Sequence, residues 1–431
     1  MRGALLRRWL ARLFAGQSEL VLESRAPTKE ELCKKFEEIE ELGVYLHIPF
    51  CRQICPYCPY NKELLNDAAA DRYASAVKRE IDFYADVIGG RPVTSLYIGG
   101  GTPTTMLQHG LPDILDHLHH ALSVQCSIHM EAHLNDLSPA NLDLIKSLGI
   151  QHVSVGVEAL QDKHLQFLER PYTANTAKTV IARALGRGFQ CFNVDLMFAL
   201  PGQDCREVEE AARIVTDLGV DQVAAYPLFH FPYTRMGSNG QANNYGWSLL
   251  VKRRQMLKVL EAVFYSSGYQ RSSVWAFTKS GIPKYCSVTV PLYVGLGASG
   301  GSYLRDVFYL NTFSVAEYIM AMEQKGTAVA LSLDLTEQMQ MAGWLYWRIY
   351  ETEFKKQDFS RRFGRDIDRV YGRYLRMLRL TGFAKDDGDR IVLTDKGAYW
   401  LHALEDVLSL GYVSRLWGTS KQEPWPTAVA L

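Results

Sequence analysis

The sequence has no excess of charge of either sign and no long uninterrupted hydrophobic run. Its 47 Lys and Arg balance 47 Asp and Glu, so the formal net charge is zero. A balanced charge excludes the overall basic surface typical of nucleic-acid-binding proteins, although a local patch is still allowed. The apolar stretch in MRGALLRRWLARLFAG (1–16) is broken repeatedly by arginine, so it predicts neither a membrane-spanning helix nor the core of a secretory signal.

Cysteine is scarce outside one cluster, and internal repeats and long low-complexity linkers are absent. The chain of 431 residues has eight cysteines, and five of them are scattered: Cys33, Cys126, Cys191, Cys205 and Cys286. This pattern excludes a disulfide framework and favours a reducing cytosol. The length predicts two or three domains, and the 47% of hydrophobic residues predicts a globular protein with a substantial core.

Residues 1–16 predict a basic amphipathic helix. Leu6, Trp9, Leu10 and Leu13 recur at helical spacing, while arginines fall on another face. Two interpretations remain open, a helix on an anionic membrane surface and a helix docked on its own protein. We favour the docked helix, because terminal helices usually pack locally. Together with the cysteine pattern, this choice leads us to expect a cytoplasmic protein. If the helix instead lies on a membrane, we expect peripheral contact at the inner face of the membrane.

Short β-branched runs alternate with helical stretches between about residues 43 and 230. This rhythm predicts an α/β fold, a closed or partial (β/α)6 parallel barrel whose chemistry lies at the carboxyl ends of the strands. The expected strands are 43–48, 94–99, 127–132, 152–157, 192–198 and 222–228. The expected helices between most of them are 71–88, 112–124, 139–149, 174–188 and 205–219.

The rhythm changes after residue 230. A helix is expected over 247–268, and later helices are followed by a strand-like IVLTDKG segment (391–397) after an acidic turn. This order predicts a mostly helical, winged-helix-like C-terminal domain, which we expect to act as a lid or docking domain without nucleic acid as a partner. The expected division is a helix and lead-in (1–40), a barrel (41–230), a barrel extension with a Gly-rich loop (231–330) and the C-terminal domain (331–431).

Cys51, Cys55 and Cys58 form a C-x3-C-x2-C motif directly after the first expected strand. Three thiolates at this spacing can hold three irons of a 4Fe-4S cluster and leave the fourth iron open for a ligand. A zinc site that borrows a distant fourth ligand such as His47 is the alternative. The place of the loop, at the catalytic end of the predicted barrel, favours the cluster.

A second motif, GGGTPT, covers Gly99, Gly100, Gly101 and Thr102 at the end of the second expected strand. Its glycines let the backbone approach a ligand closely, and Thr102 with the following proline fixes the exit of the turn. No Gly-Lys-Ser/Thr follows, which excludes a P-loop. Taken alone, the motif is also compatible with a plain turn between strand and helix.

The segment YLHIPFCRQICPYCPYN (45–61), with Tyr57 as the aromatic residue before the last cysteine, resembles the radical S-adenosylmethionine (SAM) superfamily. More narrowly, it resembles the family of the oxygen-independent coproporphyrinogen III oxidase and its relatives. The resemblance extends from about Gly43 into the C-terminal domain. It implies a 4Fe-4S cluster whose open iron is chelated by SAM, and one-electron reduction that releases a 5'-deoxyadenosyl radical. It also implies a reducing donor such as flavodoxin or ferredoxin.

The resemblance further implies which residues contact SAM. In the family the loop of residues 99–102 meets the methionyl amino end of SAM, and Tyr57 belongs to the cluster motif. Glu131 stands where the family places an acid for the amino-acid or ribose part, and Arg170 matches an arginine that neutralises the SAM carboxylate. Asp195, in NVDLMFALPGQ, matches the aspartate of a D-L-x-x-x-L-P-G-Q signature.

Two further positions are assigned to catalysis by the same resemblance. Glu158 stands where the family usually has glutamine, and Tyr45 matches a tyrosine in the region of a second SAM and the substrate.

The stretch GLGASG with Gly295 and Gly297 satisfies G-x-G-x-x-G, but no complete βαβ unit surrounds it, so a dinucleotide fold is not expected. We expect its backbone to line the mouth of the site.

The chain departs from the family at two places. Coproporphyrinogen oxidases have a fourth cysteine where this chain has Tyr60, which weakens the decarboxylase interpretation. Haem-chaperone relatives carry H-N-x-x-Y-W before the Gly-rich loop, whereas residues 283–297 read PKYCSVTVPLYVGLG, without His or Trp. Three hypotheses follow in order: methylation of a large planar or hydrophobic substrate, such as a quinone, with a second SAM; oxidation or decarboxylation of a tetrapyrrole; and haem delivery.

Overall fold

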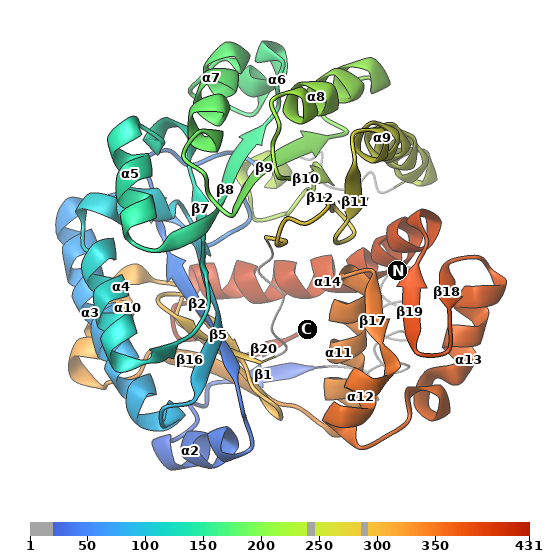
Figure 1. The fold of residues 1–431 in the computed structure, drawn as a ribbon. Helices are drawn as coiled ribbons and strands as arrows, with labels where there is room; N and C mark the ends of the chain where they lie inside the picture. Colours follow the sequence, from blue (N-terminus) through green and yellow to red (C-terminus); the bar gives the residue numbers. More distant parts are fainter. Residues whose placement is uncertain (1–19, 239–245, 286–291) are drawn as a thin grey trace.

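The structure is a computed structural model that describes residues 20–238, 246–285 and 292–431. The helix expected over residues 1–16 lies outside these ranges. Figure 1 shows a curved sheet with helices along its outer side and a mostly helical C-terminal region beside its open side. Within the described ranges, none of the helices combines the length and the apolar composition that crossing a bilayer requires.

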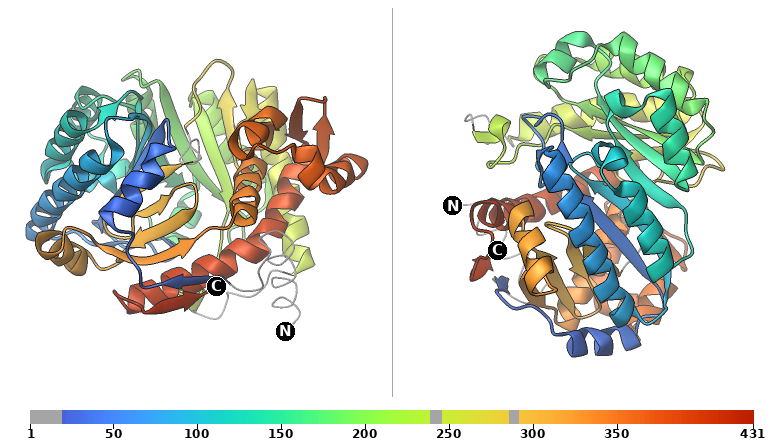
Figure 2. Two further views of the ribbon diagram at one scale, coloured as in Figure 1. Left: turned by 90° about the horizontal axis from the view of Figure 1, so that it is seen from below. Right: turned by 90° about the vertical axis from the view of Figure 1, so that its left-hand side faces the viewer.

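Six parallel strands form the centre of the sheet, which confirms the predicted order. They are β2 (Leu42–Ile48), β5 (Pro92–Gly100), β7 (Ile128–Ala132), β8 (Ile150–Glu158), β9 (Cys191–Phe198) and β10 (Gln222–Pro227), each parallel to its neighbours. Helices cover the outer face (Figure 2): α3 (Asp67–Ile88), α4 (Leu111–Ala121), α5 (Pro139–Ser147), α6 (Asp162–Phe167), α7 (Ala174–Leu185) and α8 (Cys205–Asp217). The carboxyl ends of the strands therefore meet at one edge.

The sheet does not close, so of the two predicted forms the partial barrel is the correct one. Beyond β10, the sheet continues antiparallel with β12 (Ala276–Lys279) and β11 (Tyr269–Arg271), which follow α9 (Trp247–Ser266). Beyond β2, the parallel β13 (Tyr293–Leu296) leads into an antiparallel series. The series comprises β14 (Gly301–Tyr303), β15 (Val307–Asn311), β16 (Val329–Asp334), β1 (Val21–Glu23) and β20 (Ala428–Ala430). Three short strands, β3 (Phe50–Cys51), β4 (Glu63–Leu64) and β6 (Ser123–Val124), flank the parallel region.

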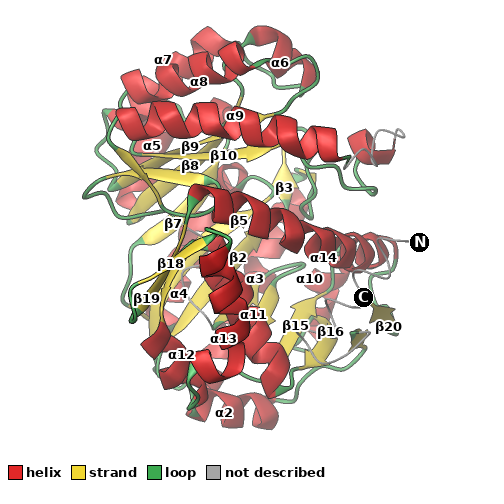
Figure 3. Cartoon of the chain, turned by 90° about the vertical axis from the view of Figure 1, so that its right-hand side faces the viewer, coloured by secondary structure: helices red, strands yellow, loops and turns green. Residues whose placement is uncertain are grey.

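The C-terminal region is mostly helical and includes a small antiparallel sheet, β17–β19–β18. Its strands are β17 (Glu353–Lys355), β18 (Ala384–Asp386) and β19 (Arg390–Leu393). Its helices are α11 (Glu337–Tyr350), α12 (Lys356–Phe363), α13 (Ile367–Leu380) and α14 (Asp395–Gln422), while α2 (Lys29–Glu37) and α10 (Val315–Gln324) lie earlier in the chain. Figure 3 shows the long helix α14 between α9 and the helices α11 to α13.

Local sequence explains where the helices begin and end. Asn66 caps α3 by accepting a hydrogen bond from the Ala69 backbone N–H, and Gly89 ends the same helix in a left-handed conformation with φ of 65°. Asp204 and Glu207 form a reciprocal capping box at the start of α8. These caps satisfy backbone groups at the ends of α3 and at the start of α8.

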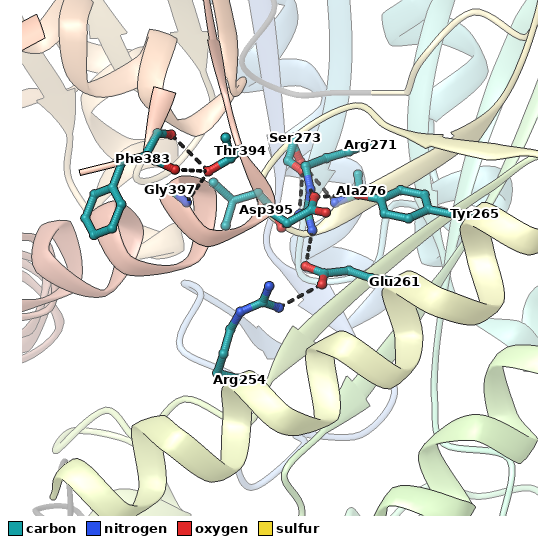
Figure 4. Close-up of polar contacts among 12 residues, drawn as sticks. Arg254, Glu261, Tyr265, Arg271, Ser273, Ala276, Phe383, Thr394, Asp395 and Gly397 are labelled. Atoms are coloured by element: carbon teal, nitrogen blue, oxygen red, sulfur yellow. Dashed lines mark hydrogen bonds and ion pairs between the residues drawn. The ribbon is translucent and has the colours of Figure 1, made fainter. Parts of the chain in front are cut away.

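A buried ion-pair network joins the C-terminal region to α9 and β11 (Figure 4). Arg271 binds Glu261 at 2.5 Å and, through Nε, Asp395 at 3.0 Å, while Arg254 binds the second oxygen of Glu261 at 2.8 Å. Tyr265 also donates its hydroxyl proton to Asp395. Asp395 is the first residue of α14, so the network fixes the start of the helix that crosses the open side of the sheet.

Replacing Arg271 by methionine is expected to lower the free energy of unfolding by about 3 to 5 kcal/mol, because it leaves a buried carboxylate with one partner fewer. The Arg271 and Glu261 side chains are only 8% and 7% exposed. Urea unfolding measures the effect. Arg213→Met, which breaks an exposed pair with Glu209, is the matched control and should cost less than about 1 kcal/mol. Equal losses in the two variants would contradict the prediction.

Candidate active site at the carboxyl ends of the strands

A cavity of about 580 Å³ lies at the carboxyl ends of the parallel strands. Its lining comes from the loop with the three cysteines, from residues 100–103, from the ends of β7 to β10, and from α11 and α14. This volume lies in the range of small-molecule sites. The C-terminal region thus forms one side of the site, while the expectation that it acts as a lid stays a prediction.

All three motif cysteines line this cavity. Cys51 ends the short strand β3 and is 8% exposed, while Cys55 and Cys58 are half-buried. Thr102 Oγ1 lies 3.3 Å from Cys51 Sγ and Arg170 Nη1 lies 3.4 Å from Cys55 Sγ, each as a donor. Burial raises the pKa of the Cys51 thiol to about 12. Bound iron would therefore be needed to hold this sulfur as a thiolate.

The donor set fits a cluster better than a single metal ion. Within the described ranges, no three His, Cys, Asp or Glu side chains are grouped so that they could hold one ion. A 4Fe-4S cluster places its ligands on separate irons, so three thiols spread around a cavity suit it. The zinc alternative also fails at His47, because both of its ring nitrogens have partners, Tyr45 Oη at 2.8 Å and the Asn61 carbonyl at 3.0 Å.

Two lysines donate hydrogen bonds to the backbone of the loop that carries the motif cysteines, here called the cluster loop. Lys62 donates to the carbonyls of Cys58 and Tyr60, and Lys421, near the end of α14, donates to the carbonyls of Pro59 and Tyr60 at 3.0 and 3.1 Å. The sequence motif gives no sign of Lys421, because 361 positions separate it from Tyr60. The C-terminal helix therefore fixes the shape of the loop that carries the thiols.

The glycines of the second motif are required mainly by neighbouring side chains and backbone. A Cβ at Gly100, where φ is 120°, would lie 2.6 Å from the ring of His47, and one at Gly101 would lie 2.7 Å from the Pro49 carbonyl oxygen. Gly100, Gly101 and Thr102 line the cavity, whereas Gly99 is not among its lining residues. Close packing against β2 and the cluster loop thus accounts for Gly100 and Gly101 before any ligand is considered.

Glu131 links the glycine loop to Tyr97 through two hydrogen bonds. One of its carboxylate oxygens accepts from the Gly100 N–H at 3.0 Å, and the other accepts from the Tyr97 hydroxyl at 2.6 Å. Burial raises the pKa of Glu131 above its ordinary value, against these hydrogen bonds. The carboxylate lines the cavity, so it can both shape the loop and face a bound ligand.

Glu158 and Arg170 form a buried pair in the same cavity. Arg170 Nη2 lies 3.5 Å from Glu158 Oε1, and Tyr226 donates to Glu158 Oε2 at 3.1 Å. Arg170 also donates to the Gly156 carbonyl and, at 2.8 Å, to the Tyr172 hydroxyl. Glu158 is one of the few non-glycine residues with positive φ, at 71°, a conformation that functional sites often hold. Burial raises the pKa of Glu158 despite the nearby guanidinium.

Asp195 is the third acid of the parallel strands, with Glu131 and Glu158, that lines the cavity. It accepts a hydrogen bond from Asn193 Nδ2 at 2.7 Å and from Ser154 Oγ at 3.3 Å. Burial, followed by repulsion from Glu158 and Glu131, holds the pKa of Asp195 well above its ordinary value. The two acids that repel the charge of Asp195 favour a ligand with positive charge beside it, such as the ammonium and sulfonium groups of SAM.

Tyr45 lies beside the cavity floor and is not among its lining residues. Its hydroxyl contacts His47 Nδ1, and His47 Nε2 contacts a carbonyl oxygen, which can only accept. Burial also lowers the pKa of His47 to about 4, so at neutral pH the ring carries its single proton on Nε2 and Tyr45 donates to Nδ1. Tyr45 contacts His47, and the His47 ring lies against Gly100 at the cavity, so Tyr45 is linked to the site only indirectly. Its assigned catalytic role remains a prediction.

The free energy of unfolding is expected to fall by up to about 3 kcal/mol between pH 6.5 and pH 4 because of His47. Burial lowers its pKa from 6.5 to about 4, so below pH 6.5 the unfolded chain binds a proton that the folded chain does not. Urea unfolding of the His47→Gln variant should show a smaller pH dependence, since other buried histidines act in both proteins. His120→Gln, at an exposed site, is the control and should leave the profile unchanged.

Gly295 and Gly297 lie away from the cavity lining, which corrects the expectation that their loop lines the mouth of the site. Gly295 pairs with Tyr45 across β13 and β2, and a Cβ there would lie 2.3 Å from the Gly301 carbonyl oxygen. A Cβ at Gly297 would lie 2.2 Å from the Tyr73 hydroxyl. The glycine pattern therefore reflects close packing between the barrel and its extension.

Sequence reasoning missed the aromatic side of the cavity. Tyr60, which is 50% exposed and stands where coproporphyrinogen oxidases keep a fourth cysteine, contacts the Trp417 ring of α14 with centroids 5.9 Å apart. The cysteine motif marks Tyr60, but no spacing rule marks Trp417, because it lies far from the motif in the chain. The aromatic residues of the lining are Tyr57, Tyr60, Tyr97, Tyr226, Phe229, Phe231, Trp275, Tyr285, Tyr346, Tyr350 and Trp417.

Comparison with known proteins agrees with this geometry. Residues 45–215 match the model of the Radical SAM superfamily. The chain is 26% identical to the heme chaperone HemW of Bacillus subtilis (strain 168) over 362 residues, 82% of this chain and 96% of that one. It is 29% identical to the anaerobilin synthase of Escherichia coli O157:H7 over 228 residues, 52% of this chain and 51% of that one.

A solved structure supports the fold. Coproporphyrinogen III oxidase (HemN) from Escherichia coli, described as a radical SAM enzyme, is 20% identical and matches with a TM-score of 0.76, covering 90% of this chain and 94% of its own. These similarities agree with the site described above, in which three cysteines line one cavity. Residues 45–215 therefore form a Radical SAM domain, and most of the chain is similar to HemW heme chaperones and to coproporphyrinogen III oxidase; the Radical SAM superfamily uses a 4Fe-4S cluster and SAM.

Proposed function

We propose that the chain binds a tetrapyrrole in the cavity beside the cluster loop and oxidises it by radical SAM chemistry, with oxidative decarboxylation of a porphyrinogen as the first candidate. One observation carries the proposal: the three cysteines and the aromatic residues of α11 and α14 line one continuous cavity. A planar macrocycle packs well against aromatic side chains. A substrate held there would lie beside the cysteines.

The names of the relatives favour a tetrapyrrole over a methyl acceptor. The proteins reported above are named heme chaperone, anaerobilin synthase and coproporphyrinogen III oxidase. These names do not support methylation with a second SAM, the first of the three hypotheses drawn from the sequence. A quinone substrate has no support from them either. We therefore place tetrapyrrole chemistry first.

The residues of the cavity have distinct roles in the proposed reaction. When bound, the cluster and SAM would supply a carbon radical that can remove a hydrogen atom from an unactivated carbon, which consumes one electron from a reducing donor; the decarboxylation would then need a one-electron acceptor. Cys51, Cys55 and Cys58 hold the cluster, Glu131 orients the glycine loop, and Arg170 supplies positive charge for a carboxylate. The helix α14 covers one side of the cavity and excludes water there. An electron donor such as flavodoxin or ferredoxin remains a prediction.

Haem binding without turnover is the second candidate, and His402 favours it. This imidazole lines the cavity and is 7% exposed. Its Nδ1 makes no hydrogen bond within the described ranges and lies 3.4 Å from Asp406 Oδ1, while Trp275 Nε1 donates to its Nε2 at 3.4 Å. Histidine is a common iron ligand, and iron binding at Nε2 would replace the Trp275 N–H that now points at this nitrogen.

Anaerobically reconstituted protein tests both candidates. With dithionite, SAM and coproporphyrinogen III, we expect 5'-deoxyadenosine and carbon dioxide to form together. A Soret band on titration with haemin, without carbon dioxide release and weakened in the His402→Ala variant, would support the second candidate. Release of S-adenosylhomocysteine with a methylated product would overturn both, and so would a protein that binds neither tetrapyrrole.

A further inference from the structure

Helix α13 in the C-terminal region presents two different faces. Its buried face consists of Ile367, Tyr371, Leu375 and Leu378. The opposite face is exposed and carries Arg369, Arg373, Arg376, Met377 and Leu380, which recur at the spacing of one helix side. Figure 1 shows α13 at the outer edge of the molecule, on its right-hand side. We call this exposed side the α13 face.

Among the described residues, the arginines of the α13 face differ from most others in their lack of an acidic partner. Arg369, Arg373 and Arg376 form no ion pair with any carboxylate in the part of the chain that the structure describes, and Arg373 only stacks on Tyr374. The neighbouring Arg379 differs, since it lies 3.4 Å from Asp386. Three adjacent unneutralised guanidinium groups create a local positive potential in a chain whose formal net charge is zero.

A polar hollow of about 700 Å³ adjoins this face. It lies between α13 and the β18–β19 turn, and the three arginines line it together with Lys356. Both of its carboxylates already have cationic partners, since Lys356 binds Asp368 at 2.9 Å and Asp386 at 3.1 Å. The free charge of the hollow is therefore positive, which suits a phosphate group.

Two apolar side chains on the same face indicate what carries the phosphate. Leu380 is 82% exposed and Met377 is 54% exposed, and both stand next to the arginines at the end of the helix. A nucleic acid or an acidic protein surface would use the arginines but would leave these side chains in water. A phospholipid bilayer uses both, because its phosphates bind arginine and its acyl boundary accepts apolar side chains.

We propose that the α13 face docks the protein on an anionic phospholipid surface. Arg369, Arg373 and Arg376 bind headgroup phosphates, while Met377 and Leu380 enter the boundary between headgroups and acyl chains. The proposed contact is made by side chains of α13 alone and does not rest on the reaction in the cavity. It places the C-terminal region, which forms one side of the active site, against the membrane.

Co-sedimentation of the full-length chain with vesicles tests the proposal. We expect binding to vesicles of phosphatidylcholine mixed with phosphatidylglycerol, and much weaker binding to phosphatidylcholine alone. The triple variant Arg369→Gln, Arg373→Gln, Arg376→Gln should bind the mixed vesicles about a hundredfold more weakly, at about a factor of five for each arginine. The pair Met377→Ser, Leu380→Ser should weaken binding about tenfold or more.

The matched control removes three exposed arginines elsewhere, Arg72→Gln, Arg206→Gln and Arg213→Gln, which lie on α3 and α8. It should bind the mixed vesicles as the unaltered chain does. Equal losses in the control and in the α13 variant would overturn the proposal. So would unaltered vesicle binding by the α13 variant, or a loss that follows the arginines but not the apolar pair. Salt-sensitive binding of duplex DNA in place of vesicles would identify a different partner.

Discussion

Replacing any one of Cys51, Cys55 and Cys58 by serine is expected to abolish both cluster binding and SAM cleavage. Each thiol lines the same cavity, and a cluster held by three protein ligands has no spare one. Even outer-shell changes at metal sites cost about 10- to 100-fold, so loss of a ligand should exceed about a hundredfold. Iron analysis should fall from about four irons per chain to near zero, with 5'-deoxyadenosine formation falling in parallel.

A matched control separates loss of the cluster from loss of the fold. Cys205→Ser alters an exposed thiol at the start of α8 and should keep both iron and SAM cleavage. Circular dichroism should show the same helix content in all four serine variants and the unaltered chain. A Cys55→Ser protein that still cleaves SAM at the normal rate would show that this thiol does not hold iron.

The second large effect is expected at Arg170. Arg170→Met removes a cation that is 5% exposed and faces Glu158, so the free energy of unfolding of the apoprotein should fall by about 3 to 5 kcal/mol. The same change should weaken SAM binding by about 10- to 100-fold, because a charge-assisted hydrogen bond to a carboxylate is worth about 1.5 to 3 kcal/mol. Urea unfolding and equilibrium dialysis measure the two losses.

A double variant shows where the lost stability comes from. If the cost is an unpaired buried charge, then Arg170→Met, Glu158→Gln should be more stable than Arg170→Met alone, because the amide carries no charge. Arg235→Met, which breaks an exposed pair with Glu169, is the control and should cost less than about 1 kcal/mol. A double variant no more stable than the single one would assign the loss to packing.

The central strands and the cysteine loop could be predicted from the sequence, because both depend on local patterns. Runs of β-branched residues separated by helical stretches predict parallel strands, and the structure confirms all six. The strand pairing beyond β2 and β10 could not be predicted, because short strands such as β14 and β20 carry few residues and pair with partners far along the chain. Whether the barrel closes depends on those pairings.

The candidate site was only partly predictable for the same reason. Motif residues at strand ends, such as Glu131, Glu158 and Asp195, lie together because parallel strands end at one edge. The aromatic side from α11 and α14 has no motif, and Lys421 is identified only by its contacts with carbonyl oxygens. Gly297 shows the opposite error, since a glycine pattern that suggested a ligand loop serves packing against Tyr73.

The contact of Lys421 with the cluster loop has a consequence for the order of assembly. During synthesis the loop leaves the ribosome long before its partner, since Tyr60 and Lys421 are 361 positions apart. Until α14 has been made and docked, the thiols lack the helix that covers one side of them. We expect iron and sulfur delivery to be easiest in this interval, so that the last helix closes over a site that has already been loaded.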